Sequence, residues 1–171
     1  YNEDPIIKSL LPPTWLNARR RTILVFTLDE SSNKVNMAAI TRYSFGSLIE
    51  SVWDKEKEPD QMKALVDYLK LKNPKKIGIN ISDTYGIADG LSVTDHKLLM
   101  NYLPKPLKKR VISSEPLAVS WVETRTEKEM ILFSHLTEIT HNIIKEAFST
   151  GVITPGVTTT DDVVWWMREK V

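Results

Sequence analysis

The sequence contains no cysteine, only six glycines in 171 residues, and almost no excess of charge of either sign. The absence of cysteine excludes disulfide bonds, thiolate metal sites and a cysteine nucleophile, although it does not identify a redox compartment. A formal net charge of +1 gives no basic surface for nucleic acid or for an anionic membrane. No apolar run approaches the roughly 20 residues that cross a bilayer. A glycine-rich phosphate loop and a Gly-x-Ser-x-Gly motif are also absent.

What is present is the composition of an ordinary soluble globular protein, with 42% hydrophobic and 26% charged residues. A chain of 171 residues can build one good core, or one core with a docked extension. The first residue is Tyr1 and not Met, so we expect that a segment upstream of it has been removed. Nothing in the sequence assigns a compartment.

The N-terminal half begins with a segment that lacks regular periodicity. Residues 1–20 are expected to be loop-like, because Pro5, Pro12 and Pro13 interrupt regular helices and inner strands.

A β-hairpin is expected next. Residues 21–29 and 35–43 are rich in β-formers and are separated by about five residues, which predicts two antiparallel strands. Both arms are mostly apolar, so we expect a sheet that is covered on both faces. Residues 44–53 are expected to form a short helix or an irregular segment.

Helices and strands then alternate. A helix with Asp60 as its N-cap carries an apolar stripe at Met62, Leu65, Val66 and Leu69, and it stops at Asn73-Pro74. A second helix opens at the capping-box variant Ser92–Asp95 and ends at Pro104 and Pro106, with Leu98, Leu99 and Tyr102 facing inward. Strands are expected at residues 76–82, 110–113 and 117–122. This order predicts an α/β layered domain with a mixed sheet and helices on both sides, ending near Glu123.

The last third of the chain predicts two helices joined by a turn. Thr126 and Glu129 form a capping box, and an apolar stripe follows at Leu132, Leu136, Ile139, Ile143 and Ala147. Gly151 is a stop signal, and Thr154-Pro-Gly156 predicts a turn. Residues 158–162 offer several oxygen acceptors to cap a final helix that carries Val163, Val164, Trp166 and Met167.

The segment Gly151-Val-Ile-Thr-Pro-Gly-Val-Thr-Thr-Thr-Asp-Asp162, after a long capped helix, resembles the opening of the catalytic "pita-bread" domain of creatinase/aminopeptidase P metallopeptidases, which include Xaa-Pro aminopeptidases and prolidases. The stretch Lys75-Lys-Ile-Gly-Ile-Asn80 and the elements around it are similar to the N-terminal domain of that family. The resemblance implies a three-layer, ribonuclease H-like domain over residues 1–125, without its usual first strand. Residues 126–171 would then be the two lead-in helices of the catalytic domain.

In that family, two Asp, one His and two Glu hold two divalent metal ions, such as Mn²⁺, Co²⁺ or Zn²⁺, that share a bridging water. Paired ions of this kind lower the pKa of the water and polarise the scissile carbonyl. No residue here matches those ligands, so the resemblance implies that they belong to a missing catalytic domain and that this chain holds no cofactor.

One family residue matches by position, at the end of the segment Ile49-Glu-Ser-Val-Trp53. In relatives of aminopeptidase P an aromatic residue of such a segment lines the substrate channel of a neighbouring subunit. The resemblance therefore makes Trp53 a substrate-channel candidate that packs on a proline ring or closes the channel to longer substrates. The alternative, favoured by the usual behaviour of aromatic side chains, is that Trp53 covers an apolar edge of the sheet.

Other candidate sites have ordinary structural explanations. His135 and His141 lie about 120° apart on a helix, unlike the i, i+4 pair of a zinc protease, so an exposed helix face containing them and Glu138 is favoured over a metal site. Asp161 and Asp162 stand at a helix start, which favours capping.

The loop aspartates and the adjacent tryptophans also have structural explanations. Asp29, Asp83, Asp89 and Asp95 could be compared with the clustered acids of a ribonuclease H-like nuclease. The last three lie at loop or cap positions, where aspartate is expected for turn formation, and this explanation is favoured. Trp165 and Trp166 point about 100° apart, so one short helix cannot bury both.

The sequence therefore predicts a non-catalytic N-terminal part of an Xaa-Pro metallopeptidase, whose role is to shape substrate access and subunit contacts. Its expected partners are the missing catalytic domain, a second subunit of a homo-oligomer and, in the parent protein, proline-containing peptides; neither nucleic acid nor a membrane is expected. Two alternatives stay open. One is a protein-binding module that has lost the metal, and the other is part of a creatinase-like amidinohydrolase.

Overall fold

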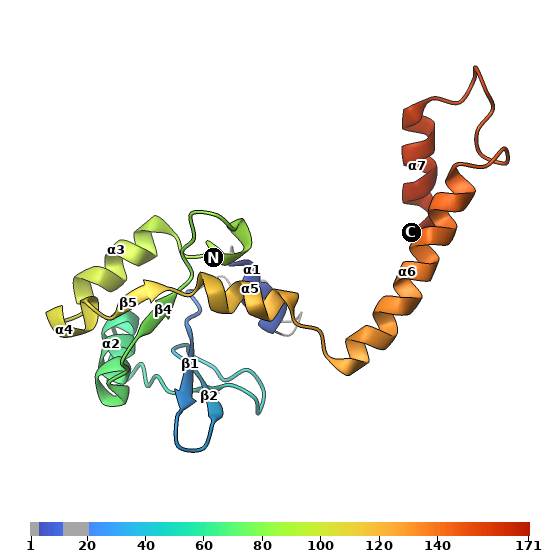
Figure 1. Cartoon of the computed structure of the whole chain (residues 1–171). Helices are drawn as coiled ribbons and strands as arrows, with labels where there is room; N and C mark the ends of the chain where they lie inside the picture. Colours follow the sequence, from blue (N-terminus) through green and yellow to red (C-terminus); the bar gives the residue numbers. More distant parts are fainter. Residues whose placement is uncertain (1–3, 12–20) are drawn as a thin grey trace. The chain divides into compact units, whose positions relative to one another are not determined.

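The computed structural model of the protein describes residues 4–11 and 21–171. The chain forms two compact units, Tyr1–Val122 and Glu123–Val171, and each is described by itself. The elements of unit 1 are α1 (Pro5–Leu10), β1 (Leu24–Asp29), β2 (Lys34–Ala39), β3 (Glu50–Ser51), α2 (Gln61–Lys72), β4 (Ile77–Ile79), η2 (Gly86–Ala88), α3 (Val93–Tyr102), α4 (Lys105–Lys108), β5 (Val111–Ser113) and α5 (Glu115–Glu123), which reaches the unit boundary (Figure 1). Unit 2 contains α6 (Glu127–Ala147) and α7 (Thr160–Lys170). None of the helices in the described ranges is long and apolar enough to cross a membrane.

Unit 1 is an α/β fold with a mixed sheet. β1 and β2 pair antiparallel as the predicted hairpin, and β2 also pairs in parallel with the short strand β3. The sequence had indicated a helix or irregular chain where β3 forms. β4 and β5 make a second, parallel two-stranded sheet, connected through η2, α3 and α4.

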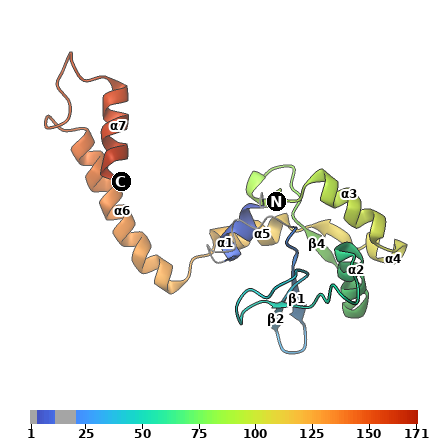
Figure 2. The same cartoon turned by 180° about the vertical axis from the view of Figure 1, so that it is seen from behind.

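The hairpin is covered on both faces only near its base. Val25 packs against the main core on one face, and Leu24 packs beside the buried Ala39 on the other. Toward the hairpin loop, Phe26 and Leu28 are exposed. Figures 1 and 2 show this end of the hairpin extending away from α3 and α5. The expectation of a fully covered sheet is therefore wrong for the outer half, where Phe26 and Leu28 stay exposed among the described residues.

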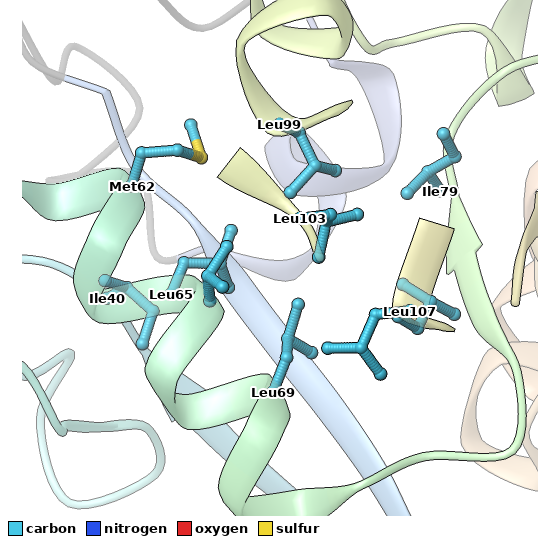
Figure 3. Packing of buried hydrophobic residues seen from close by; sticks show 10 residues of the cluster. Ile40, Met62, Leu65, Leu69, Ile79, Leu99, Leu103 and Leu107 are labelled. Carbon is cyan, nitrogen blue, oxygen red and sulfur yellow. The ribbon is translucent and has the colours of Figure 1, made fainter. Parts of the chain in front are cut away.

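The main core lies between α2, the α3–α4 segment and β4 (Figure 3). The predicted apolar stripe of α2 is confirmed, since its four members are all buried, and Asp60 caps the helix by accepting from the backbone N–H groups of Met62 and Lys63. Asn73 ends α2 with a φ of 42°, a left-handed conformation that asparagine tolerates better than most residues. Leu99 enters the same core from α3.

Two segments differ from the sequence-based expectation. Residues 117–122, predicted as a strand, belong to α5, because Ala118, Val119 and Val122 recur at helical spacing and form its more buried side. Pro5 was expected to prevent a helix, yet it occupies the first turn of α1, where the missing N–H has no intrahelical role. Asp4 caps that helix. Pro12 and Pro13 lie outside the described residues.

Unit 2 is a pair of capped helices. Thr126 and Glu129 form the predicted capping box at the start of α6. Thr159 and Asp162 form a second one at the start of α7, which confirms the capping role expected for Asp162. Gly156 takes a φ of 76° in the turn between the helices, a value that favours glycine. Both predicted helices therefore form, with strong stop and start signals between them.

Candidate functional site

Trp53 lies two residues after β3, where the chain leaves the sheet and approaches α2. Its side chain is half-buried and packs against the main core. The indole Nε1 donates a hydrogen bond to the backbone carbonyl of Glu58 at 2.7 Å. A tryptophan N–H that is taken from water needs such a partner, and here the bond also fixes the plane of the ring.

An open hollow of about 570 Å³ lies beside Trp53. Its walls combine two aromatic rings, two hydroxyl groups and four charged side chains: Tyr43, Trp53, Ser44, Ser51, Arg42, Asp54, Lys55 and Glu56. The hollow is open to solvent and its lining is mostly polar, unlike the enclosed and mostly apolar pockets that bind small molecules. Trp53, the substrate-channel candidate, therefore lies at the edge of a hollow and is also anchored to the core.

Short-range hydrogen bonds hold the walls of this hollow in place. The Ser51 hydroxyl donates to the backbone carbonyl of Thr41 at 2.5 Å, and the Ser51 N–H donates to the Ser44 hydroxyl at 3.0 Å. The buried Thr41 hydroxyl in turn donates to the carbonyl of Tyr43 at 2.6 Å. The two bonds of Ser51 join the chain after β2 to the strand β3 and so hold the two sides of the hollow together.

Asp54, on the wall of the hollow, has a lowered pKa. The Lys57 ammonium, 3.1 Å from the Asp54 carboxylate, lowers the pKa of Asp54, and backbone N–H groups of Glu56 and Lys57 add to the effect. A carboxyl group with a lowered pKa stays ionised and is a poor general acid.

Metal binding by the histidine-bearing helix finds no support in the geometry. His135, Glu138 and His141 all lie on the exposed surface of α6. Within residues 4–11 and 21–171, no three His, Cys, Asp or Glu side chains gather closely enough to hold a metal ion.

The four acids considered for a nuclease centre occupy separate places. Asp29 accepts from the Ser31 and Ser32 hydroxyls at the hairpin loop. Asp89 accepts from a loop N–H at 3.3 Å, Asp95 accepts from Arg21 at 2.8 Å, and Asp83 is exposed. Asp89 supports its loop and Asp95 the start of α3, where it bonds to Ser92, as the turn and cap interpretation expected for these two.

A polar network at the carboxyl ends of β4 and β5 was missed by the sequence analysis. Asn80 follows β4, donates to the Asp4 carboxylate at 2.7 Å and accepts from the Ser114 hydroxyl at 2.6 Å. Ligands often bind at this edge of an α/β sheet, but here the polar atoms bond to one another. The signal available in the sequence was the polar residue directly after each strand. The network joins α1 to the sheet.

Unit 2 presents an apolar face that is only partly covered. The α6 stripe consists of Leu132, Leu136, Ile139, Ile143 and Ala147. Ala147 is fully buried and Ile143 half-buried where α7 packs beside them, whereas Leu132 and Leu136 are 61% and 56% exposed. Helices of 21 and 11 residues are about 31 and 16 Å long, so α7 can cover only half of α6.

The two adjacent tryptophans of α7 have different environments. Trp165 is 60% exposed, with the Arg168 guanidinium 5.0 Å from its ring centre. Trp166 is half-buried, and the Lys170 ammonium lies 4.9 Å from its ring centre while also pairing with Glu146 of α6. As the sequence predicted, the helix buries at most one of the pair.

No family model, curated protein or solved structure matches this chain.

Proposed function

We propose that this chain is the non-catalytic N-terminal region of a metallopeptidase of the creatinase/aminopeptidase P family, in which it shapes substrate access and subunit contacts. The observation that carries the proposal is the α6 stripe, which stays open at Leu132, Leu136 and Ile139. An amphipathic helix with half of its apolar face uncovered is suited to packing against a further domain. In the proposed parent, that domain is the catalytic one.

The α/β unit supports the same assignment. It has a mixed sheet, and its helices and strands between residues 61 and 113 follow the order described for the family's N-terminal domain. A three-layer, ribonuclease H-like arrangement is part of this proposal. The two divalent metal ions and their ligands belong, in this proposal, to the catalytic domain of the parent.

Trp53 supplies the proposed access function. Its indole is held by Glu58, so the exposed part of the ring keeps a fixed orientation at the hollow. A flat, immobile ring of this kind suits contact with the pyrrolidine ring of a proline-containing peptide. In a homo-oligomer, the hollow would face the substrate channel of the neighbouring subunit.

A protein-binding module without metal chemistry is the second candidate function. The same exposed stripe favours it, because an apolar helix face can equally accept a separate protein. The two candidates differ in what is encoded after Val171, so the reading frame decides between them.

The test is to sequence the transcript beyond the codon for Val171 and assay the encoded polypeptide. A frame that continues with two Asp, one His and two Glu, and a product that hydrolyses Xaa-Pro peptides with Mn²⁺, Co²⁺ or Zn²⁺, supports the proposal. An encoded pita-bread domain without those ligands supports the binding module. A frame that stops or encodes an unrelated domain contradicts the family assignment, as does hydrolysis of Xaa-Pro peptides by residues 1–171 alone.

The docking role has its own matched pair of variants. Leu136→Glu places a charge on the α6 stripe, whereas Ile131→Glu places one about 140° away on an exposed side of the helix. In the full-length polypeptide we expect Leu136→Glu to lower the thermal midpoint and the activity, and Ile131→Glu to leave both near the unmodified values. Equal effects of the two substitutions would contradict docking through the stripe.

A further inference from the structure

The outer edge of β1 has backbone groups that point away from the sheet. The N–H of Ile40 donates to the carbonyl of Ile23 at 2.9 Å, so this pair is a hydrogen-bonded pair of the antiparallel ladder. Such pairs alternate along a ladder, which turns the backbone groups of Val25 and Thr27 toward β2 and those of Leu24, Phe26 and Leu28 outward.

A second hydrogen bond supports this assignment of inward and outward backbone groups. The carbonyl of Ala39, which lies opposite Leu24, accepts from the N–H of Val52 on the far side of β2. In the non-hydrogen-bonded pairs, the backbone N–H and C=O groups therefore point away from the partner strand of the hairpin, on β2 as on β1.

Within the part of the chain that the structure describes, this edge has none of the features that usually prevent strand addition. Natural edge strands are commonly blocked by proline, lysine, a bulge or a covering element. The segment Leu24–Asp29 contains no proline and no lysine, and its register with β2 is unbroken from Leu24 to Asp29. Among the described residues, β1 is the terminal strand of its sheet, and no other strand pairs with its outer side.

The side chains beside the open edge are apolar and exposed. Phe26 lies directly opposite Met37, and Leu28 directly opposite Val35, all on one face of the hairpin. Their side chains are exposed by 44%, 41%, 60% and 58% in that order. A strand that added to the edge would extend this apolar face.

We propose that the outer edge of β1 pairs antiparallel with β1 of a second copy of the chain, with Phe26 on the twofold axis. In this register Leu24 lies opposite Leu28 of the second copy, and Phe26 lies opposite its own equivalent. Leu24, Phe26 and Leu28 of each strand thus all lie opposite apolar residues of the second copy. Because each hydrogen-bonded pair exchanges two bonds, the edge would form about six bonds between the copies.

Charge at the two ends of the strand favours a second copy in this orientation. Arg21, whose guanidinium also pairs with Asp95 of its own copy at 2.8 Å, precedes the strand, and Asp29 ends it. In the antiparallel register, Asp29 lies opposite Ile23 of the second copy and diagonal to its Arg21, at both ends of the pair. A parallel arrangement would instead place the two Asp29 carboxylates together. The apolar ladder and the end charges are therefore self-complementary only when the strands run in opposite directions.

The expected association is weak. A six-residue strand is about 20 Å long, and its edge buries much less than the roughly 800 Å² per partner of a standard stable interface. We therefore expect a reversible dimer that is populated only at protein concentrations of about 0.1 mM and above. This inference concerns unit 1 alone and does not depend on the proposed function.

Single cysteines test the register directly, because the chain has none of its own. In the proposed pair the two Phe26 Cα atoms are about 5.5 Å apart, within the range of a disulfide bond. Two Met37 Cα atoms would be separated by three strand spacings, about 14 Å. We expect Phe26→Cys to form a covalent dimer under mild oxidation at about 0.1 mM protein, and the equally exposed Met37→Cys to form at least tenfold less. Equal cross-linking of both variants, or none of Phe26→Cys, overturns the proposal.

Amide hydrogen exchange on the unmodified chain of 171 residues gives a second readout that needs no variant. The amides of Leu24, Phe26 and Leu28 should gain protection as protein concentration rises, while those of Val25 and Thr27 stay protected throughout. Exchange at the three outward amides that does not change up to 1 mM protein overturns the second-copy pairing. Protection that appears only when an unrelated strand-forming peptide is added would assign the edge to a different partner, and so would also overturn it.

Discussion

Gly90 fills a position where a side chain has no room, and its replacement tests how α1 is attached to unit 1. A Cβ at this position would lie 2.3 Å from Cγ and 2.8 Å from Cα of Asp4. Carbon atoms pack at about 3.5–4.0 Å, so Gly90→Ala must push the start of α1 away by about 1 Å.

The size of the effect follows from the bonds that Asp4 makes. Moving Asp4 by about 1 Å would lengthen its 2.7 Å bond with Asn80 beyond the range of a hydrogen bond. A bond to a charged group contributes about 1.5–3 kcal/mol, and partial exposure places this one near the lower end. We therefore expect Gly90→Ala to reduce the free energy of unfolding by about 1–2 kcal/mol.

Urea unfolding and amide exchange together measure this change. Gly86→Ala is the matched control, because it lies in the same loop region and a Cβ there meets nothing within 4 Å. The Gly90 variant should lower the urea midpoint and speed exchange at Leu11, whose N–H donates to Ile7 at the end of α1. Equal stability and equal Leu11 exchange in the two variants would refute the reasoning.

Three further outcomes are expected. The Ser31 and Ser32 hydroxyls lower the pKa of Asp29 from 3.8 to about 2, so this carboxylate supports the hairpin loop above about pH 4 and loses that effect as the pH falls toward 2; carbon NMR titration should find a higher midpoint in Ser31→Ala. Leu65→Ala in the core should cost about 2–5 kcal/mol in urea unfolding, against less than about 0.5 kcal/mol for the 79%-exposed Leu71. Trp53→Phe replaces the indole with a smaller phenyl ring and removes the N–H donor, so unfolding should show a loss of at least about 1 kcal/mol from the lost bond and the reduced packing. An unshifted Asp29, an inert Leu65→Ala or an unchanged Trp53→Phe would contradict these assignments.

Sequence reasoning worked best where structure is decided locally. The cap at Asp60 and the stripe from Met62 to Leu69 lie within one helix, so the residues that specify α2 are neighbours in the chain. The capping box at Thr126 was found for the same reason. In each case a few adjacent side chains satisfy the helix terminus and define its buried side.

The errors arose where similar residues suit two structures. Val119, Trp121 and Val122 favour strands by propensity, but the spacing of Ala118, Val119 and Val122 is helical, and packing of that side decided the outcome. Pro5 suits two structures as well, because proline breaks a helix interior but is accepted in the first turn, where it lies in α1.

The candidate site was predictable only in part. Trp53 could be selected from its segment, but its bond to Glu58 and the hollow beside it depend on how the chain after β2 folds back. The link between Asp4 and Asn80 joins residues 76 positions apart. No local pattern specifies a contact over that separation, and the same holds for the steric requirement at Gly90.

The shortness of α7 relative to α6 leaves unit 2 with a small core, and under the proposed function this couples its folding to docking. Ala147 and Val163 are its fully buried side chains among the described residues, which is too small a core to offset the conformational entropy of about fifty residues. In the proposed parent, the domain that packs on the α6 stripe would supply much of the free energy that holds α6 helical. A substitution that changes only helix propensity would then be measured as a change in affinity for that domain.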